Sequence, residues 1–134
     1  MIDARARAVL DELERHDARE RQQGTPRAER LRQVTPDVGR FLHTLVLAAR
    51  PRTIVEIGTS GGYSTIWLAT AARATGGSLV TLEIDPVKVR TARESLADAG
   101  VAKSVNAADL KSAIARAICG FEPHPRHHTL TQSV

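Results

Sequence analysis

A glycine-rich stretch lies between a short apolar run and a helical pattern, over residues 56–64 (EIGTSGGYS). Glycine permits a tight turn there, and it lets a ligand touch the backbone because no Cβ stands in the way. The free N–H groups of the helix that begins near Tyr63 favour a carboxylate or a phosphate. Ser64 can add a hydroxyl donor in the first turn. Glycines also punctuate ordinary turns between strands and helices, so the loop alone is a weak indication of a nucleotide cofactor.

Glu83 strengthens the interpretation of this loop as a cofactor site. It ends the next apolar run, 25 residues after Gly58, where an acid binds the ribose hydroxyls in nucleotide-binding α/β folds. A carboxylate can accept hydrogen bonds from both ribose hydroxyls at once. The alternative is a surface acid before a helix, with Asp85 serving only as the N-cap of that helix. The combination of loop, helix start and acid favours a bound nucleotide.

Glu56 indicates which kind of cofactor the loop would bind. Dinucleotide sites bring a pyrophosphate onto the helix after a Gly-x-Gly-x-x-Gly loop, whereas here a carboxylate lies two residues before Gly58. A negative charge at that point repels a pyrophosphate and attracts a cationic or amino-bearing ligand. S-adenosylmethionine has a sulfonium, an amine and no phosphate, so it fits better than NAD. The alternative, a Glu56 carboxylate that is merely satisfied by backbone donors, stays open.

The elements that must position these residues alternate between strand and helix. Residues 53–57 and 78–84 are short apolar runs that predict strands, the first of them covered on both faces as in a parallel sheet. Helical periodicity follows each run, over residues 63–74 and 86–99. This order predicts right-handed crossovers and a parallel sheet. The segment 103–108 suggests a third strand only at its start.

Two helices are predicted before the sheet, over residues 2–21 and 36–49. The first has a narrow apolar stripe among interleaved charges, with His16 at the surface. Thr35 is a suitable N-cap for the second, and the proline and the acid that follow suit its first turn. His43 is expected at the border of the apolar face of this second helix. That face is wide and consists of Val38, Phe41, Leu42, Leu45, Val46 and Ala49.

The composition of the chain indicates which binding partners and which cellular compartment to expect. The 134 residues suit a single domain, and the net charge of +4 raises nucleic acid as a partner. The charges of both signs are interleaved and the chain has only four aromatic residues, so it offers no platform for stacking bases. We therefore expect no nucleic-acid partner. No apolar run approaches the roughly 18 residues that span a bilayer, no signal-peptide pattern is visible, and a single cysteine fits a reducing compartment. These features predict a cytoplasmic protein with no membrane partner.

Residues from about 27 to 101 resemble the N-terminal half of the small class I O-methyltransferases. This group contains the catechol and caffeoyl-CoA O-methyltransferases and their bacterial relatives. Three blocks in order carry the resemblance: residues 34–39 (VTPDVG), the loop at 56–64, and residues 82–86 (LEIDP). The resemblance implies an S-adenosylmethionine-dependent O-methyltransferase that acts on a small hydroxylated substrate. It also implies an α/β fold with a Rossmann-like parallel sheet, incomplete in this chain and preceded by two helices.

The resemblance assigns the methionyl end of the cofactor to four residues. Val34 and Thr35 would contact the methionyl part, and Glu56 would lie beside the same end. Ser64 would bind the methionyl carboxylate.

The remaining implied roles concern the loop, the nucleoside and the substrate. Gly58 and Thr59 would line the loop, Glu83 would take the ribose, and Asp109 is the only candidate for an adenine contact. Three arginines just before the first block are candidates to meet an acidic substrate, with a solvated surface as the alternative: Arg27, Arg30 and Arg32.

The second half of the family pattern is absent from this chain. That half carries the catalytic residues and the ligands of the divalent metal that some members use, so catalytic residues stay unknown and no metal ligands are assigned. The alternative function is a truncated, non-catalytic remnant that binds the cofactor or associates with itself. An unfinished parallel sheet leaves an open edge and apolar faces, which predicts a homodimer.

The expected domain organisation has three parts. Residues 1–50 form an N-terminal helical cap, and residues 51–118 form a truncated Rossmann-like cofactor-binding domain that ends in a helix capped by Asp109. Residues 119–134 form a loose tail without periodicity. A metal site in that tail is the less favoured alternative, because zinc ligands usually occur in closer pairs on ordered loops; it would use Cys119, His124, His127 and His128.

Overall fold

Three parallel strands form the sheet of the computed structural model, which describes residues 2–109. Strand β1 (Thr53–Ile57) pairs with β2 (Ser78–Glu83), and β2 pairs with β3 (Val105–Asp109), so the strand order is β1-β2-β3. The helix predicted after Asp109, the tail and its cysteine and histidines lie outside the described residues. The first two strands lie where the sequence predicts them.

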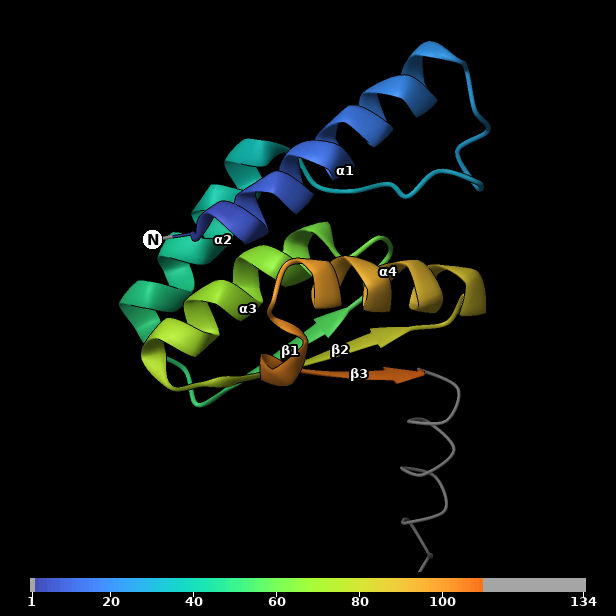
Figure 1. Cartoon of the computed structure of the whole chain (residues 1–134). Coiled ribbons are helices and arrows are strands. Elements are labelled where there is room, and N and C mark those ends of the chain that lie inside the picture. The colour runs from blue at the N-terminus through green and yellow to red at the C-terminus, as the bar shows by residue number, and fades with distance from the viewer. Residues whose placement is uncertain (1, 110–134) are drawn as a thin grey trace, which may run out of the picture.

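Both crossover helices cover the same face of the sheet. Helix α3 (Tyr63–Thr75) connects β1 to β2, and helix α4 (Pro86–Asp98), followed by the short helix η1 (Ala102–Ser104), connects β2 to β3. Each new strand is added on the same side of the previous one, so two right-handed crossovers place both helices on one face. Figure 1 shows helices α1, α2, α3 and α4 on that side of the sheet.

The prediction that residues 53–57 are covered on both faces is wrong for this part of the chain. Ile54 and Glu56 point toward the helices and are half-buried, whereas Val55 is 62% exposed and Ile57 is 78% exposed. Strand β1 also lies at the edge of the sheet, and none of the other described elements pairs with its second side. The open edge and apolar face expected of an unfinished sheet are therefore confirmed at β1, whereas self-association through them stays a prediction.

The third strand is longer than the sequence indicates. Residues 106–108 have no β-branched side chains, yet Val105–Asp109 runs parallel to β2 over its whole length, with Glu83 opposite Asp109. Backbone pairing with a strand already in place outweighs weak intrinsic preference. Asp109 consequently lies at the same edge of the sheet as Glu83.

Helix α1 (Ala4–Gln22) connects the start of the chain to α4, which is distant in sequence. Asp3 caps it by accepting a hydrogen bond from the N–H of Ala6 at 2.8 Å. The Arg5 guanidinium donates to the carbonyl oxygens of Ala97 and Asp98 at the end of α4. Apolar side chains of α1, α3, α4 and β2 then form one core, which includes Leu10, Leu13, Ile66, Trp67, Leu79 and Leu96.

Helix α2 (Pro36–Ala49) packs against α3 through a face that shares only Leu42 and Val46 with the one that its apolar pattern predicts. Thr35 is the N-cap residue, but its side chain makes no capping hydrogen bond. His43 is buried, not at a border, and its Nδ1 lies 3.0 Å from the carbonyl oxygen of Trp67. Phe41 is 63% exposed. The contact face is set by Gly39, which lies directly against the Trp67 indole, so the smallest side chain decides which face of α2 can approach.

Gly39→Ala is expected to lower the free energy of unfolding by about 1–3 kcal/mol, as is usual when a packed core is overfilled. A Cβ at this position would overlap the Trp67 indole. The indole has little freedom to move, because it is 95% buried and packs edge-on against the His43 ring with centroids 5.9 Å apart. Urea unfolding followed by the fluorescence of the single tryptophan measures the effect. Thr44→Ala, at an exposed position of the same helix, is the matched control, and equal midpoints for the two variants would contradict the packing argument.

Candidate cofactor site

The glycine loop turns sharply at the carboxyl end of β1. The N–H of Gly58 donates to the carbonyl oxygen of Leu82 at 2.8 Å, which continues the pairing with β2. Gly58 and Gly62 have φ values of +92° and +90°, and Ser60, a non-glycine residue, has a φ of +52°. These left-handed conformations favour glycine at the first two positions and strain the backbone at the third. A Cβ built on Gly58 would meet nothing within 4 Å, so its backbone faces open space.

Residues from the N-terminal half of the chain pack against the outer side of the glycine loop. A Cβ on Gly61 would lie 2.8 Å from Leu31 Cδ1 and 3.5 Å from Leu13 Cδ2. The Ser60 hydroxyl donates to the carbonyl oxygen of Leu31. The segment that joins α1 to α2 therefore lies directly on the loop and fixes its shape.

Glu56 is held by side-chain hydroxyls, not by the backbone donors that the sequence left as an alternative. Its Oε1 accepts from the Ser64 hydroxyl at 2.6 Å, and its Oε2 accepts from the hydroxyls of Thr65 and Thr81, each at 2.6 Å. A carboxylate oxygen has two lone pairs. Oε2 is thus fully used, while Oε1 can accept one further hydrogen bond from a ligand.

Glu83 is buried and not the surface acid that the sequence left as an alternative, with only 8% of its surface exposed. Its Oε2 accepts from the N–H of Ser60 at 2.8 Å, and its Oε1 accepts from the N–H groups of Ile84 and Asp85 at 2.8 and 3.1 Å. Burial by itself raises the pKa of this carboxyl, but these three N–H groups and the charge of Lys88 lower its pKa below the ordinary value overall. Glu83 is therefore an anion at neutral pH, and its Oε2 retains a free lone pair.

Two pockets meet at Ile57 and Gly58, one on each side. The pocket on the Glu83 side has a volume of about 460 Å³, and the pocket on the Glu56 side has a volume of about 650 Å³. Both volumes lie within the range of small-molecule sites. Arg27, Leu31, Arg32, Ser60, Leu82, Ile84 and Lys88 also line the first pocket. Val34, Leu42, Leu45, Val46, Ala49, Pro51, Thr53, Ile54, Val55, Ser64 and Leu68 also line the second.

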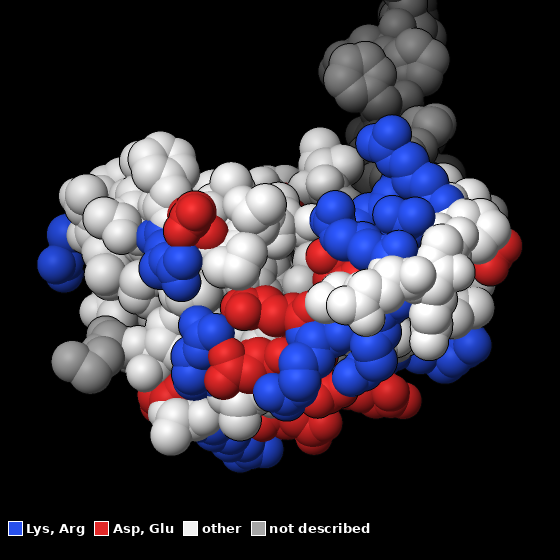
Figure 2. Space-filling view, turned by 90° about the horizontal axis from the view of Figure 1, so that it is seen from above, with Lys and Arg blue, Asp and Glu red and all other residues white. Residues whose placement is uncertain are grey.

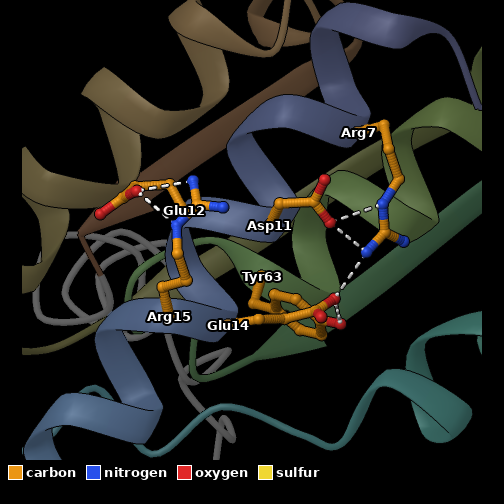
Figure 3. Close-up of polar contacts among 6 residues, drawn as sticks. All are labelled: Arg7, Asp11, Glu12, Glu14, Arg15 and Tyr63. Atoms are coloured by element: carbon orange, nitrogen blue, oxygen red, sulfur yellow. Dashed lines mark hydrogen bonds and ion pairs between the residues drawn. The ribbon is translucent and has the colours of Figure 1, made fainter.

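Tyr63 fixes the start of α3 against α1, as Figure 3 shows. Its hydroxyl donates to Glu14 Oε1 at 2.7 Å, and the same oxygen lies 3.1 Å from the Arg7 guanidinium, which also pairs with Asp11. Burial, together with the hydrogen bond to Glu14, raises the pKa of Tyr63 to about 12. The phenol therefore stays protonated and remains a donor. The first turn of α3 has no side-chain cap, so its N–H groups are left free to bind an anion.

The structure brings most of the predicted cofactor residues to the two pockets but not all of them. Val34, Glu56 and Ser64 line the second pocket, Glu83 lines the first, and Gly58 lines both.

Two of the predicted residues lie elsewhere. Thr35 is exposed at the N-cap of α2 and lines neither pocket. Thr59 is buried, and its hydroxyl lies 2.7 Å from the hydroxyl of Thr81. We infer that Thr59 shapes the loop from behind, because its side chain points into the sheet and away from both pockets.

The sequence did not indicate Lys88 as a pocket residue, since it lies in the first turn of α4 among other charged positions. The cap at Asp85, which accepts from the N–H groups of Val87 and Lys88 at 2.8 and 3.4 Å, sets the direction of that turn. Arg32 and Arg27 were candidates for an acidic substrate, and both line the same pocket as Lys88. Arg30 does not, because its guanidinium donates to the carbonyl oxygen of Thr25 at 2.6 Å.

Among the side chains of residues 2–106, no three of histidine, cysteine, aspartate or glutamate gather closely enough to hold a metal ion. No helix in the same range is long and apolar enough to cross a membrane.

A family model described as O-methyltransferase matches residues 2–118. The chain belongs to the O-methyltransferase family. The resemblance noted from three short blocks of the sequence is therefore confirmed over most of the chain.

Relatives with assigned names in the O-methyltransferase family share the region of the loop. A catechol O-methyltransferase of Mycobacterium tuberculosis is 47% identical over 72 residues, which are 54% of this chain and 32% of the relative. A catechol O-methyltransferase of Niastella koreensis is 40% identical over 72 residues, with the same coverage of 54% and 32%. The matched part thus spans about a third of the length of these relatives.

Solved O-methyltransferase structures match the fold. The enzyme from Bacillus cereus, in complex with SAH, aligns with a TM-score of 0.66 and 32% identity, covering 86% of this chain and 49% of that one. TomG from Streptomyces achromogenes, in complex with SAM, aligns with a TM-score of 0.63 and 34% identity, covering 84% and 48%. The predicted α/β class with an incomplete Rossmann-like parallel sheet is confirmed, and the chain corresponds to about half of each structure.

Proposed function

We propose that this chain carries the S-adenosylmethionine site of an O-methyltransferase whose methyl acceptor is a small hydroxylated molecule. The observation that supports this most is the pair of carboxylates on either side of Gly58. Glu56 and Glu83 line adjoining pockets, each is held in place by three hydrogen bonds, and each has one oxygen with a free lone pair. A ligand with donors at both ends and no phosphate in the middle suits this arrangement.

The orientation of the cofactor follows from the two carboxylates. Glu83 accepts from the ribose hydroxyls in the first pocket, and Glu56 attracts the amino group in the second. Because the Ser64 hydroxyl already donates to Glu56, Ser64 binds the methionyl carboxylate through its N–H in the uncapped first turn of α3, and Val34 lies beside the methionyl chain. The bound cofactor supplies an activated methyl group. The residues of this chain hold it in one orientation across Gly58, and such positioning provides much of the rate in a direct transfer.

The acceptor is proposed to enter on the side of Glu56. The pocket there is lined largely by apolar side chains of α2 and β1, including Leu42, Leu45 and Ile54. An apolar wall excludes water from the transferring group and binds the carbon skeleton of a small substrate. A hydroxyl on that skeleton is the oxygen nucleophile that the family requires.

Calorimetric titration of the chain with S-adenosylhomocysteine and with NAD tests the proposal. We expect saturable binding of S-adenosylhomocysteine with a stoichiometry of one, and no binding of NAD because Glu56 repels the pyrophosphate. The demethylated product is chosen because it contacts the same residues and does not react. Binding of NAD without binding of S-adenosylhomocysteine would contradict the proposal.

A further inference from the structure

Three cations converge on the pocket beside Glu83 from two separate segments. Arg27 and Arg32 come from the segment between α1 and α2, and Lys88 comes from the first turn of α4. Among the described side chains that line the pocket, Glu83 is the one carboxylate, so their charges sum to +2. Figure 2 shows basic side chains gathered toward the end of the molecule where α1 ends, while acidic and basic side chains alternate along α1 itself.

These three cations differ from the basic residues of α1 because they form no ion pair with a described side chain. Arg7, Arg15, Arg19 and Arg21 of α1 each lie within 4 Å of a carboxylate. Among the side chains of residues 2–106, Arg27, Arg32 and Lys88 form no such ion pair. Glu83 offsets only one of their three charges, and its carboxylate is held by three backbone N–H groups and not by a guanidinium.

The backbone around this pocket is held in an uncommon conformation. Arg32 and Ser60 both have positive φ values, +46° and +52°, although neither is a glycine. The hydroxyl of Ser60 donates to the carbonyl oxygen of Leu31, the residue before Arg32. Strained non-glycine residues cluster at ligand sites, where the surrounding structure keeps them in place. Arg32, one of these two residues, lines the pocket that also contains Glu83.

We propose that Arg27, Arg32 and Lys88 form an anion subsite that receives a phosphate or carboxylate group of the methyl acceptor. This inference rests on the proposed function, since it places the acceptor beside bound cofactor. A guanidinium binds phosphate and carboxylate oxygens through paired N–H donors, and a lysine adds a point charge. A pocket of about 460 Å³ fits a small molecule, and the scarcity of aromatic residues argues against a nucleic-acid strand. The cofactor itself occupies the path across Gly58, so the acceptor would lie alongside it and place its anionic group at the outer side of this pocket, where Arg27 and Arg32 are exposed.

Inorganic pyrophosphate is the probe for this subsite. The chain, saturated with S-adenosylhomocysteine in phosphate-free buffer, is titrated with pyrophosphate by calorimetry. We expect binding that weakens as salt is added, and about a tenfold weaker affinity in each of Arg27→Ala and Arg32→Ala. Arg90→Ala is the control, because Arg90 is exposed on α4 and does not line the pocket. Equal affinity of all variants, or no binding by the unmodified chain, would overturn the proposal.

A second ligand shows whether the three cations bind the acceptor or the carboxylate of the cofactor. 5′-Methylthioadenosine has the nucleoside of the cofactor but lacks its amino acid part. If Arg32→Ala weakens the binding of S-adenosylhomocysteine but not that of 5′-methylthioadenosine, the cations hold the carboxylate of the cofactor and the acceptor subsite is refuted. If S-adenosylhomocysteine does not bind at all, the proposed function fails. Titration of the cofactor-free chain with pyrophosphate then still decides whether the three cations bind an anion.

Discussion

Glu83→Ala is expected to weaken the binding of S-adenosylhomocysteine by about 10- to 100-fold, as is typical for the loss of hydrogen bonds to a charged group. Alanine at this position removes two functions of the side chain at once. Its free lone pair on Oε2 is the acceptor proposed for the ribose, and its occupied lone pairs hold the N–H groups of Ser60, Ile84 and Asp85. Calorimetric titration of the variant beside the unmodified chain measures the change in the dissociation constant.

One further variant separates the contribution of Glu83 to ribose binding from its contribution to the shape of the loop, and a second serves as a control. Glu83→Gln keeps the shape of the side chain and one acceptor oxygen, so it should preserve more of the loop than alanine does while still losing the charge. Glu94→Ala, at an exposed position of α4 outside both pockets, should bind as the unmodified chain does. Unchanged affinity in Glu83→Ala would show that the ribose does not lie against this carboxylate.

Glu56→Ala is expected to reduce the free energy of unfolding by about 3 kcal/mol, the upper range for leaving buried polar groups without a partner. The hydroxyls of Thr65 and Thr81, both fully buried, would lose their common acceptor, and Ser64 would lose its own. The same substitution should also weaken cofactor binding, because it removes the charge that attracts the amino group. Urea unfolding and calorimetry measure the two effects separately.

Glu29→Ala is the matched control for Glu56. Glu29 is exposed in the segment between α1 and α2, and no described side-chain contact depends on it. If Glu56→Ala unfolds at the same urea concentration as Glu29→Ala, the hydroxyl cluster contributes nothing to stability. The role of Glu56 would then be limited to the ligand.

The sequence predicted the elements whose residues carry their own local signal. Strands β1 and β2 are short apolar runs bounded by proline or glycine, and α4 begins at an Asp-Pro cap, so all three lie where expected. The spacing between Gly58 and Glu83 likewise predicted that both line one site. Each of these signals depends on a few neighbouring residues and needs no knowledge of the rest of the fold.

The features that the sequence missed depend on residues far apart in the chain. The burial of His43 is decided by Gly39 and Trp67 from two helices, and no local pattern contains that contact. The exposure of Val55 follows from the order of the strands, which places both crossover helices on the opposite face. Lys88 and the arginines before α2 likewise come together only once the loop has folded.

The contact between Arg5 and the end of α4 has a consequence for how the chain folds as it is synthesised. The two sides of this contact are 92 and 93 residues apart. At ordinary rates of translation, residue 98 follows the end of α1 after about 4–15 s. Helices in proteins owe most of their stability to tertiary packing of an apolar face, and the apolar side chains of α1 pack on α3 and α4. Helix α1 is therefore made first but docks late, and the glycine loop acquires its final shape only after most of the described chain has emerged.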